Sequence, residues 1–324
     1  MIVNTTSQTT LILNNVTIKS STTAGIAQIG SGTLVLKILS GSSVALEDAK
    51  GASTDYDACI YSAGHLKIEG SGSLSVTGQQ SEGEGIATEA NDMTINGNVT
   101  IKVVSADDGL NAGGEGGLIT ISGGFLTIQA GGDGIDSNKN LRITGGTVYS
   151  MGSSAGGDAG IDTDDGYSIE GGTVVALGSD MLETPQTSST QITLCFNLDS
   201  RISSGTIVSV TDRSGKMVVS FKALEEFSTL IISTSTLKAG TYKLYSGGRV
   251  SGSLWNNFYP TSSTLSGGTA ITANSASEFT VTSSSTVFSF GKSKSGGGGG
   301  SSSGGGGGSA PGGSPPSHTQ SLLQ

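Results

Sequence analysis

The chain has 324 residues, of which 13% are charged and 5% aromatic, while 53 are glycine. Its formal net charge is -10 and no basic stripe is present, so nucleic acid is not an expected partner. Cys59 and Cys195 lie far apart in strand-like segments, which excludes a zinc site and indicates buried thiols. Little charge together with abundant Ser, Thr and Gly favours an all-β secreted protein over a cytosolic enzyme.

The N-terminal part of the chain contains short apolar segments with strand-like alternation, at residues 11–18, 34–38, 44–46, 66–68 and 74–76. We interpret them as degenerate copies of the repeat that follows. The chain opens at Met1 without a basic region or a long apolar stretch. We therefore expect neither a signal peptide nor a membrane span in this sequence.

A repeat of about 25 residues follows. Its anchors are Ile86, Leu110, Ile135 and Ile161, which are 24, 25 and 26 residues apart. Each anchor precedes a polar turn, an alternating strand, usually a Gly-Gly pair, and a second strand. Glycine pairs suit corners that need a positive φ, and they occur at 123/124, 145/146 and 171/172.

This pattern predicts an all-β fold, a parallel β-helix (solenoid) in which each strand pairs with its equivalent one coil away. A leucine-rich repeat is less expected, because its fixed leucine frame is missing. We expect coils over residues 1–183 and a C-terminal antiparallel β region over 184–294 that caps them. Residues 295–324 are almost entirely Gly, Ser and Pro in their first part, which predicts a disordered tail.

Acidic residues are concentrated in the repeat. Residues 82–165 contain thirteen of them against Lys102, Lys139 and Arg142, which accounts for the whole net charge of -10. Stacking of the coils would bring equivalent positions to about 4.8 Å from each other. Asp108, Asp133 and, one residue off register, Asp158 would then form a column beside a second column of oxygen-bearing side chains.

Like charges at that distance repel unless a cation neutralises them, and carboxylate, amide and carbonyl oxygens suit Ca²⁺. We therefore predict calcium between the coils. The alternative is that these acids form a solvated face or serve as turn residues. The predicted ligands are Asp108, Asn111, Asp133, Asp136, Asp158, Asp162 and Asp164.

Four residues are candidates for contact with a ligand. Arg142 and Lys139 are the only credible bases near the acidic column for a lyase reaction, although an exposed, solubilising Arg is the ordinary expectation in such a strand. Trp255 and Tyr259 lie in the single dense aromatic cluster, Trp-Asn-Asn-Phe-Tyr-Pro. Aromatic platforms bind sugars, but packing within the cap is the favoured interpretation of this cluster.

The order of several motifs resembles that of the bacterial carbohydrate-binding domain-containing β-helix family. These motifs are ACIYS at 58–62, HLKI at 65–68, GGDGIDSN at 131–138, ITGGTV at 143–148, GTIVSV at 205–210 and GTYKLY at 240–245. The resemblance covers about residues 10–290. It implies a right-handed parallel β-helix, similar in fold to pectate lyases, that binds calcium and plant-type polysaccharides such as cellulose or pectin-like acids.

We therefore expect an extracellular or cell-surface, non-catalytic module that binds polysaccharide, is stabilised by Ca²⁺ and is a monomer. One alternative is a calcium-dependent polysaccharide lyase of the pectate type, which needs a strong base beside the metal. A second alternative is a structural or adhesive β-solenoid, which regular outward columns of threonine would favour; the threonines here do not keep one register.

Overall fold

The computed structural model describes residues 1–52, 54–89, 91–114, 116–155 and 157–292. Within these ranges the regular structure consists of β-strands, and no helix is present. It follows that no helix of the described residues could cross a membrane. Residues 1–292 form one compact unit. The Gly/Ser tail predicted at 295–324 lies outside the described residues.

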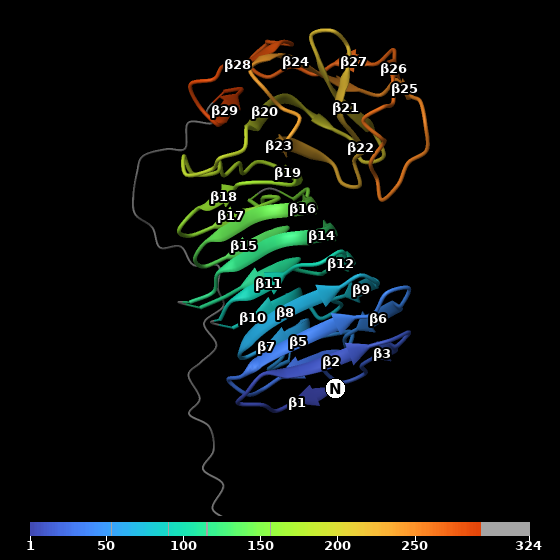
Figure 1. Cartoon of the computed structure of the whole chain (residues 1–324), viewed down its shortest axis with the longest axis vertical. Coiled ribbons are helices and arrows are strands. Elements are labelled where there is room, and N and C mark those ends of the chain that lie inside the picture. Colours follow the sequence, from blue (N-terminus) through green and yellow to red (C-terminus); the bar gives the residue numbers. More distant parts are fainter. Residues whose placement is uncertain (53, 90, 115, 156, 293–324) are drawn as a thin grey trace, which may run out of the picture. The chain divides into compact units, whose positions relative to one another are not determined.

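One wall of the solenoid is a parallel sheet, which we call sheet A (Figure 1). Its register places Ile86 beside Leu110 and Leu110 beside Ile135, which confirms the predicted alignment of the repeat anchors. Among the described residues its strands are, in spatial order, β1 (Ile2–Val3), β4 (Ile26–Gln28), β7 (Ala58–Ser62), β10 (Glu84–Thr88), β13 (Leu110–Ala112), β15 (Ile135–Ser137) and β17 (Asp162–Thr163).

The remaining walls belong to a second sheet, sheet B, in which each coil contributes two successive segments. The first segments are β2 (Thr9–Leu13), β5 (Thr33–Ile38), β8 (His65–Gly70), β11 (Met93–Ile95) and β18 (Tyr167–Ile169). The second are β3 (Thr17–Lys19), β6 (Ser43–Glu47), β9 (Ser73–Thr77), β12 (Thr100–Val104) and β19 (Thr173–Gly178). Two long strands, β14 (Ile119–Gln129) and β16 (Leu141–Met151), supply both segments of their coils.

The predicted glycine corners are therefore bends within continuous strands in two of the coils. The register between β14 and β16 shifts around Ser122, next to Gly123 and Gly124. The second glycine of each pair takes the positive φ that was predicted, 84° at Gly124, 83° at Gly146 and 86° at Gly172. A residue with a Cβ resists that conformation, so glycine is needed at these three bends.

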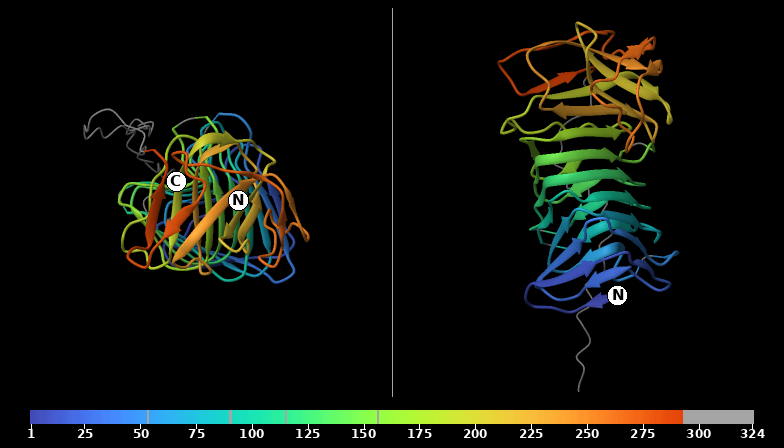
Figure 2. Two further views of the ribbon diagram at one scale, coloured as in Figure 1. Left: turned by 90° about the horizontal axis from the view of Figure 1, so that it is seen from above. Right: turned by 45° about the vertical axis from the view of Figure 1, so that its right-hand side comes forward.

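Side chains that point into the solenoid form a continuous apolar core running from Leu13 to Val174 and on to Cys195 and Ile231. The repeat anchors Ile86, Leu110 and Ile135 are fully buried in it. No single coil could bury such a face alone, so the stacking of coils supplies the apolar contacts that stabilise the fold. Figure 2 shows this stacking from the side and from above.

The parallel stacking of coils ends at β19. This strand pairs in antiparallel fashion with β23 (Phe227–Thr234), and β23 pairs in the same way with β20 (Thr193–Ile202). The last strand of the sheet, β29 (Val287–Phe290), pairs parallel with β20. The antiparallel C-terminal region that was predicted is thus present. Its other strands are β21 (Ile207–Asp212), β22 (Met217–Lys222), β24 (Gly240–Ser246), β25 (Arg249–Val250), β26 (Leu265–Ser266), β27 (Thr269–Ala270) and β28 (Phe279–Val281).

A second apolar core lies under these strands. It contains the outward-facing side chains of the last coils, among them Tyr149 and Val175, together with Phe196 and Phe221 of the C-terminal strands. The C-terminal region therefore covers the outer face of sheet B at β16 and β19, where an uncovered sheet would offer apolar surface and strand edges to other chains.

Candidate functional site

Two columns of oxygen-bearing side chains run along the outer face of sheet A. Successive residues of a strand point to opposite faces, so the half-buried neighbours of the buried anchors point outward. Asn111 pairs with Asp136, and Asp136 pairs with Asp162, which makes one column. The same register, followed three residues toward the N-terminus, aligns Glu84, Asp108 and Asp133 in the other.

Backbone amides and one side-chain amide orient the carboxylates of the second column. The backbone N–H of Asp133 donates to Asp108 Oδ1 at 2.7 Å, and that of Ala159 donates to Asp133 Oδ1 at 2.5 Å. Asn111 Nδ2 donates to Asp108 Oδ2 at 3.1 Å and to Glu84 Oε1 at 3.5 Å. Each carboxylate thus contacts the next coil, which keeps the columns in register.

The electrostatics of these columns is unfavourable to ionisation. Burial, reinforced by neighbouring carboxylates, raises the pKa of Asp108, Asp133 and Asp136 to about 7. Burial followed by the charge of Asp57 raises the pKa of Glu84 to about 8. The buried Glu84 Oε2 has no hydrogen-bond partner among the described residues. Burial and mutual repulsion oppose ionisation of these carboxyl groups, so a bound cation would stabilise their charged forms.

No lysine or arginine neutralises the columns within the described part of the chain. The nearest pair in sequence joins Lys139 Nζ to Asp165 at 3.4 Å, outside both columns. In the same residue ranges no group of three or more His, Cys, Asp or Glu is placed to hold a metal ion. The protein therefore supplies a row of oxygen atoms but not a closed coordination shell.

The other predicted ligands lie near the C-terminal end of the columns. Asp158 is one residue out of register, as predicted, because Ala159 occupies the equivalent position beside Asp133. Its carboxylate is bonded to Ser153, and burial raises its pKa. The charge of Asp164 is among those that raise the pKa of Asp136.

Two members of this acidic face were missed by the sequence reasoning. Glu84 is 24 residues before Asp108, which is one period of the repeat, so the spacing could have identified it. Glu183 could not have been found in this way, because it lies beyond the repeat. Its carboxylate accepts from the Thr163 N–H and hydroxyl, both at 2.7 Å, beside Asp162.

Arg142 lies on β16 of sheet B. Its ion-pair partner is Glu170, which belongs to neither acidic column. Its Nε and Nη2 donate to the two oxygens of Glu170, both at 2.7 Å. This bidentate pair raises the pKa of Arg142 above its already high ordinary value. A guanidinium held in this way keeps its proton, so it is a poor general base.

The aromatic cluster at 255–260 is divided between core and surface. Phe258 packs against the second apolar core, as predicted for a cap, whereas the Trp255 side chain is 62% exposed. A groove of about 430 Å³ is lined by residues of β12 and β14 and by Leu224, Leu254, Asn256 and Asn257, and Trp255 is not among its lining residues. Tyr259 is half-buried, and its backbone N–H donates to Ser220.

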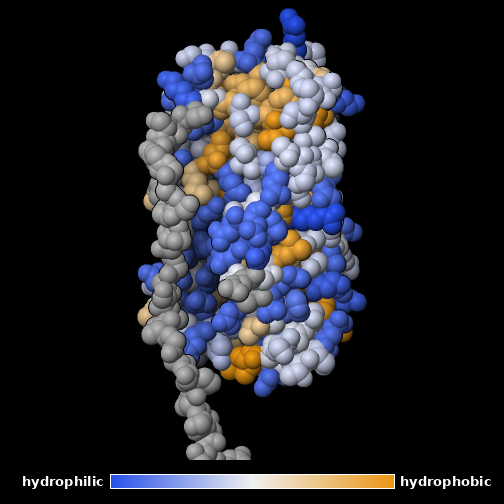
Figure 3. Space-filling view, turned by 90° about the vertical axis from the view of Figure 1, so that its left-hand side faces the viewer, coloured by the Kyte–Doolittle hydropathy of each residue, from blue (hydrophilic) through white to orange (hydrophobic). Residues whose placement is uncertain are grey.

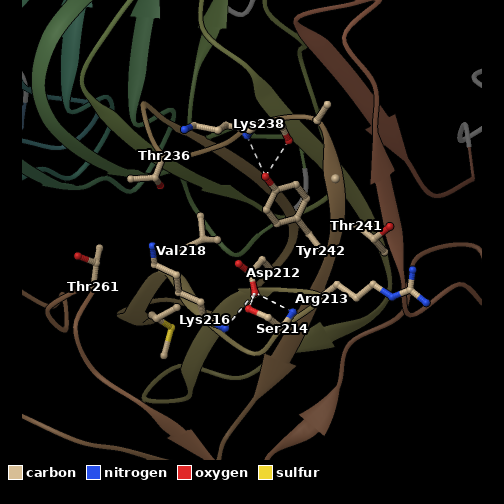
Figure 4. A pocket seen from close by; sticks show the side chains of 13 residues that line it. Asp212, Arg213, Ser214, Lys216, Val218, Thr236, Lys238, Thr241, Tyr242 and Thr261 are labelled. Atoms are coloured by element: carbon tan, nitrogen blue, oxygen red, sulfur yellow. Dashed lines mark hydrogen bonds between the residues drawn. The ribbon is translucent and has the colours of Figure 1, made fainter.

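A second cavity, of about 510 Å³, lies in the C-terminal region between the β21–β22 turn and the start of β24. Figure 4 shows Arg213 and Lys238 pointing in opposite directions, so these cations do not converge on one ligand. Asp212 accepts hydrogen bonds from Ser214 and from the Lys216 N–H, and Tyr242 is bonded to the Lys238 backbone. These hydrogen bonds stabilise the turn and account for the positions of Asp212 and Tyr242 in the cavity wall.

Figure 3 shows one side of the molecule by hydropathy. Hydrophilic residues dominate the middle of this side, and hydrophobic residues gather toward the end that the C-terminal strands occupy. On this side, the polar surface thus lies mainly over the coils. The fold and the acidic outer face of sheet A define a class, the parallel β-solenoids with an open surface along the stacked coils.

Comparison with known proteins assigns the family. A family model described as "Carbohydrate-binding domain-containing protein" matches residues 1–275, and the chain belongs to this family. A solved structure of a polysaccharide lyase-like protein from C. thermocellum, a gadolinium derivative, is 27% identical. The match covers 52% of this chain and 72% of that one, with a TM-score of 0.38. No curated protein matches. The family resemblance inferred from the sequence is confirmed.

Proposed function

We propose that this protein is an extracellular, non-catalytic module that binds an acidic polysaccharide through calcium ions on the outer face of sheet A. The observation that carries the proposal is the pair of stacked columns, in which Asp108, Asp133 and Asp136 all have a pKa raised to about 7 and face no cation among the described residues. Ca²⁺ relieves this repulsion and accepts the irregular shells that carboxylate and amide oxygens provide.

An open row of oxygens suits a bridging role for the ion. Ca²⁺ takes about six to eight oxygen ligands, and the described residues do not supply a complete set at one point. The remaining positions are free for water and for the carboxylates of a uronic acid polymer. Without the ion, the acidic face would repel such a polymer. Binding is therefore expected to require calcium, and the millimolar Ca²⁺ found outside cells suits a site of modest affinity.

The environment of the basic residues supports binding without catalysis. A lyase needs a group that can accept the proton next to the uronate carboxyl. Arg142 is committed to Glu170, and Lys139 is paired with Asp165. Neither forms an ion pair with the columns where the metal would lie. The polymer is thus expected to be retained and not cleaved.

The test is retention of the protein on immobilised polygalacturonate, with Ca²⁺ and with a chelator. Ultraviolet absorbance of the unsaturated product is followed in the same samples. Retention that needs Ca²⁺, without product, supports the proposal. Product formation in the calcium samples would show that the protein is a lyase. Retention that persists in the chelator would show that binding does not need the metal.

Matched variants locate the site. Asp133→Asn removes one charge from the columns while its side-chain oxygen can still accept the Ala159 N–H, so calcium-dependent retention should weaken about tenfold. Glu82→Gln removes one charge from an exposed side chain of the same acidic segment, and retention should stay unchanged. Equal losses in both variants would mean that total charge, not the columns, governs binding.

A further inference from the structure

The first coil leaves one end of the solenoid open. Its strands β1, β2 and β3 pair on one side only, with β4, β5 and β6 of the second coil. No other described strand pairs with their opposite edges. At the other end of the solenoid, by contrast, β23 covers the edge of β19 (Figure 2). The open end therefore presents three backbone edges to which another chain can add strands.

The apolar core is incompletely buried at this end. Leu11 of β2 is half-buried, whereas Leu36, its partner in the second coil, is fully buried. The same difference separates Ile18 of β3 from its partner Leu46. It arises because the second coil has a neighbour on both sides and the first coil has one. A further layer of strands on this end would bury the remaining apolar surface, which is a favourable change.

Large apolar side chains are also exposed around the open end. Met1, Ile2 and Ile12 are 47%, 58% and 63% exposed. Three of the six large apolar side chains that are exposed in the described ranges thus belong to this single coil. Scattered apolar side chains need no explanation, but their concentration beside free strand edges marks a surface for contact with another protein.

The charge of this end permits contact between two identical surfaces. In the first 46 residues the charged side chains are Lys19 and Lys37, and the first acid along the chain is Glu47. Lys19 Nζ lies 2.9 Å from Glu47 Oε1, so its charge is balanced within one chain. The acids of residues 82–165 belong to later coils. Two copies that meet at their first coils would therefore keep their acidic faces apart, although each chain has a net charge of -10.

The open end is also large enough for a stable dimer. Ile2 pairs with Ala27, 25 positions later, so one coil supplies up to 25 residues. A standard protein interface uses about 20–30 residues from each side. The end has an apolar centre, and Asn, Ser and Thr predominate in the segments between its strands. An apolar centre with a polar rim is the usual composition of such interfaces.

We propose that this protein forms a dimer in which two copies meet head to head through their first coils, in place of the monomer expected from the sequence. A two-fold axis through β2, perpendicular to the solenoid axis, makes β2 antiparallel to β2 of the second copy and brings β1 opposite β3. The register that pairs all of Thr9–Leu13 places Leu11 opposite itself and Ile12 opposite Thr10. The two Leu11 side chains then join both apolar cores into one.

The symmetry closes this assembly at two copies. Each chain has one open end, and the dimer uses both, so no free end of this kind remains for further growth. The C-terminal strands would lie at the two outer ends. The dimer would carry two acidic faces, so a polymer long enough to reach both would be held more tightly than by one. Only this last consequence rests on the proposed function.

The test is sedimentation equilibrium of the whole protein in a chelator and without polysaccharide, over about 1–100 µM, where interfaces of modest affinity dissociate. We expect a reversible equilibrium between one chain and two. A single-chain mass over the whole range, or growth beyond two chains, would overturn the proposal. Because neither metal nor polymer is present, this result is separate from the calcium-dependent retention described above, and either can fail alone.

Charge substitutions locate the interface. Ile12→Glu places a carboxylate on the exposed side of β2 and should raise the dissociation constant at least about tenfold, because the change occurs twice in the dimer. Adding Thr10→Lys to this variant places an ammonium opposite each carboxylate, so most of the affinity should return. Leu254→Glu, the same kind of change at an exposed leucine of the C-terminal region, is the control and should dimerise normally. Circular dichroism checks folding. A folded Ile12→Glu protein with unchanged affinity, or no recovery in the double variant, would contradict the assignment.

Discussion

The acidic columns make the stability of this protein depend on pH in an unusual direction. In the unfolded chain, carboxyls of this kind ionise near about pH 4. In the folded chain, Asp108, Asp133 and Asp136 hold their protons up to about pH 7. Between these values the folded state binds more protons than the unfolded state. Without Ca²⁺, the free energy of unfolding should therefore fall as the pH rises.

The expected loss of stability can be worked out for one residue, Asp133. Raising the pKa of Asp133 from 3.8 to about 7 corresponds to about 4 kcal/mol against the charged form. Its partial exposure reduces this through solvent screening, so we expect about 2–3 kcal/mol. Asp108 and Asp136, whose pKa values are raised mainly by burial, act in the same direction. For a folded unit of this size, Tm should fall by about 3–5 °C.

The assay is thermal unfolding in a chelator, at about pH 5.5 and about pH 8, and again with about 5 mM Ca²⁺. We expect Ca²⁺ to restore the Tm that is lost at the higher pH. Asp133→Asn should raise Tm at about pH 8 in the chelator, because the uncharged amide avoids the penalty, and should reduce the gain from Ca²⁺. A wild-type Tm that is constant or rises with pH in the chelator would refute this electrostatic account.

Three other predictions follow from individual contacts. Arg142→Ala should leave the midpoint of chemical denaturation nearly unchanged and polygalacturonate retention intact, because its ion pair is exposed; lost retention would contradict this. Gly134→Ala should cost about 2 kcal/mol or more, because a Cβ would lie 2.6 Å from the Gly160 carbonyl oxygen; an unchanged Tm would be inconsistent with that packing. Cys59 and Cys195 should resist a thiol reagent until the protein unfolds, since both are buried with a pKa raised to about 12; rapid labelling of the native protein would show that the core opens.

Much of the solenoid could be predicted because its information is local and repeated. The spacing of Ile86, Leu110 and Ile135 reappears as direct pairing in sheet A. In the structure, Asn111 and Asp136 stand beside these buried anchors and point to the outer face, an orientation that the sequence indicated only as the alternative. The antiparallel C-terminal strands were also foreseen, but how β23 would continue sheet B from β19 was not, since that pairing joins segments about 50 residues apart with no common period.

The sequence by itself determined the period, the anchors and the acidic character of one face, because parallel stacking converts equal spacing into neighbouring positions. Only the tertiary structure decided which side chains come into contact when they are not separated by one period of the repeat. It brought Glu183 to Thr163, gave Arg142 its partner Glu170, and left Trp255 exposed while Phe258 became partly buried. The physical reason is that such contacts depend on how loops and the C-terminal strands fold back over the coils, which no local pattern encodes.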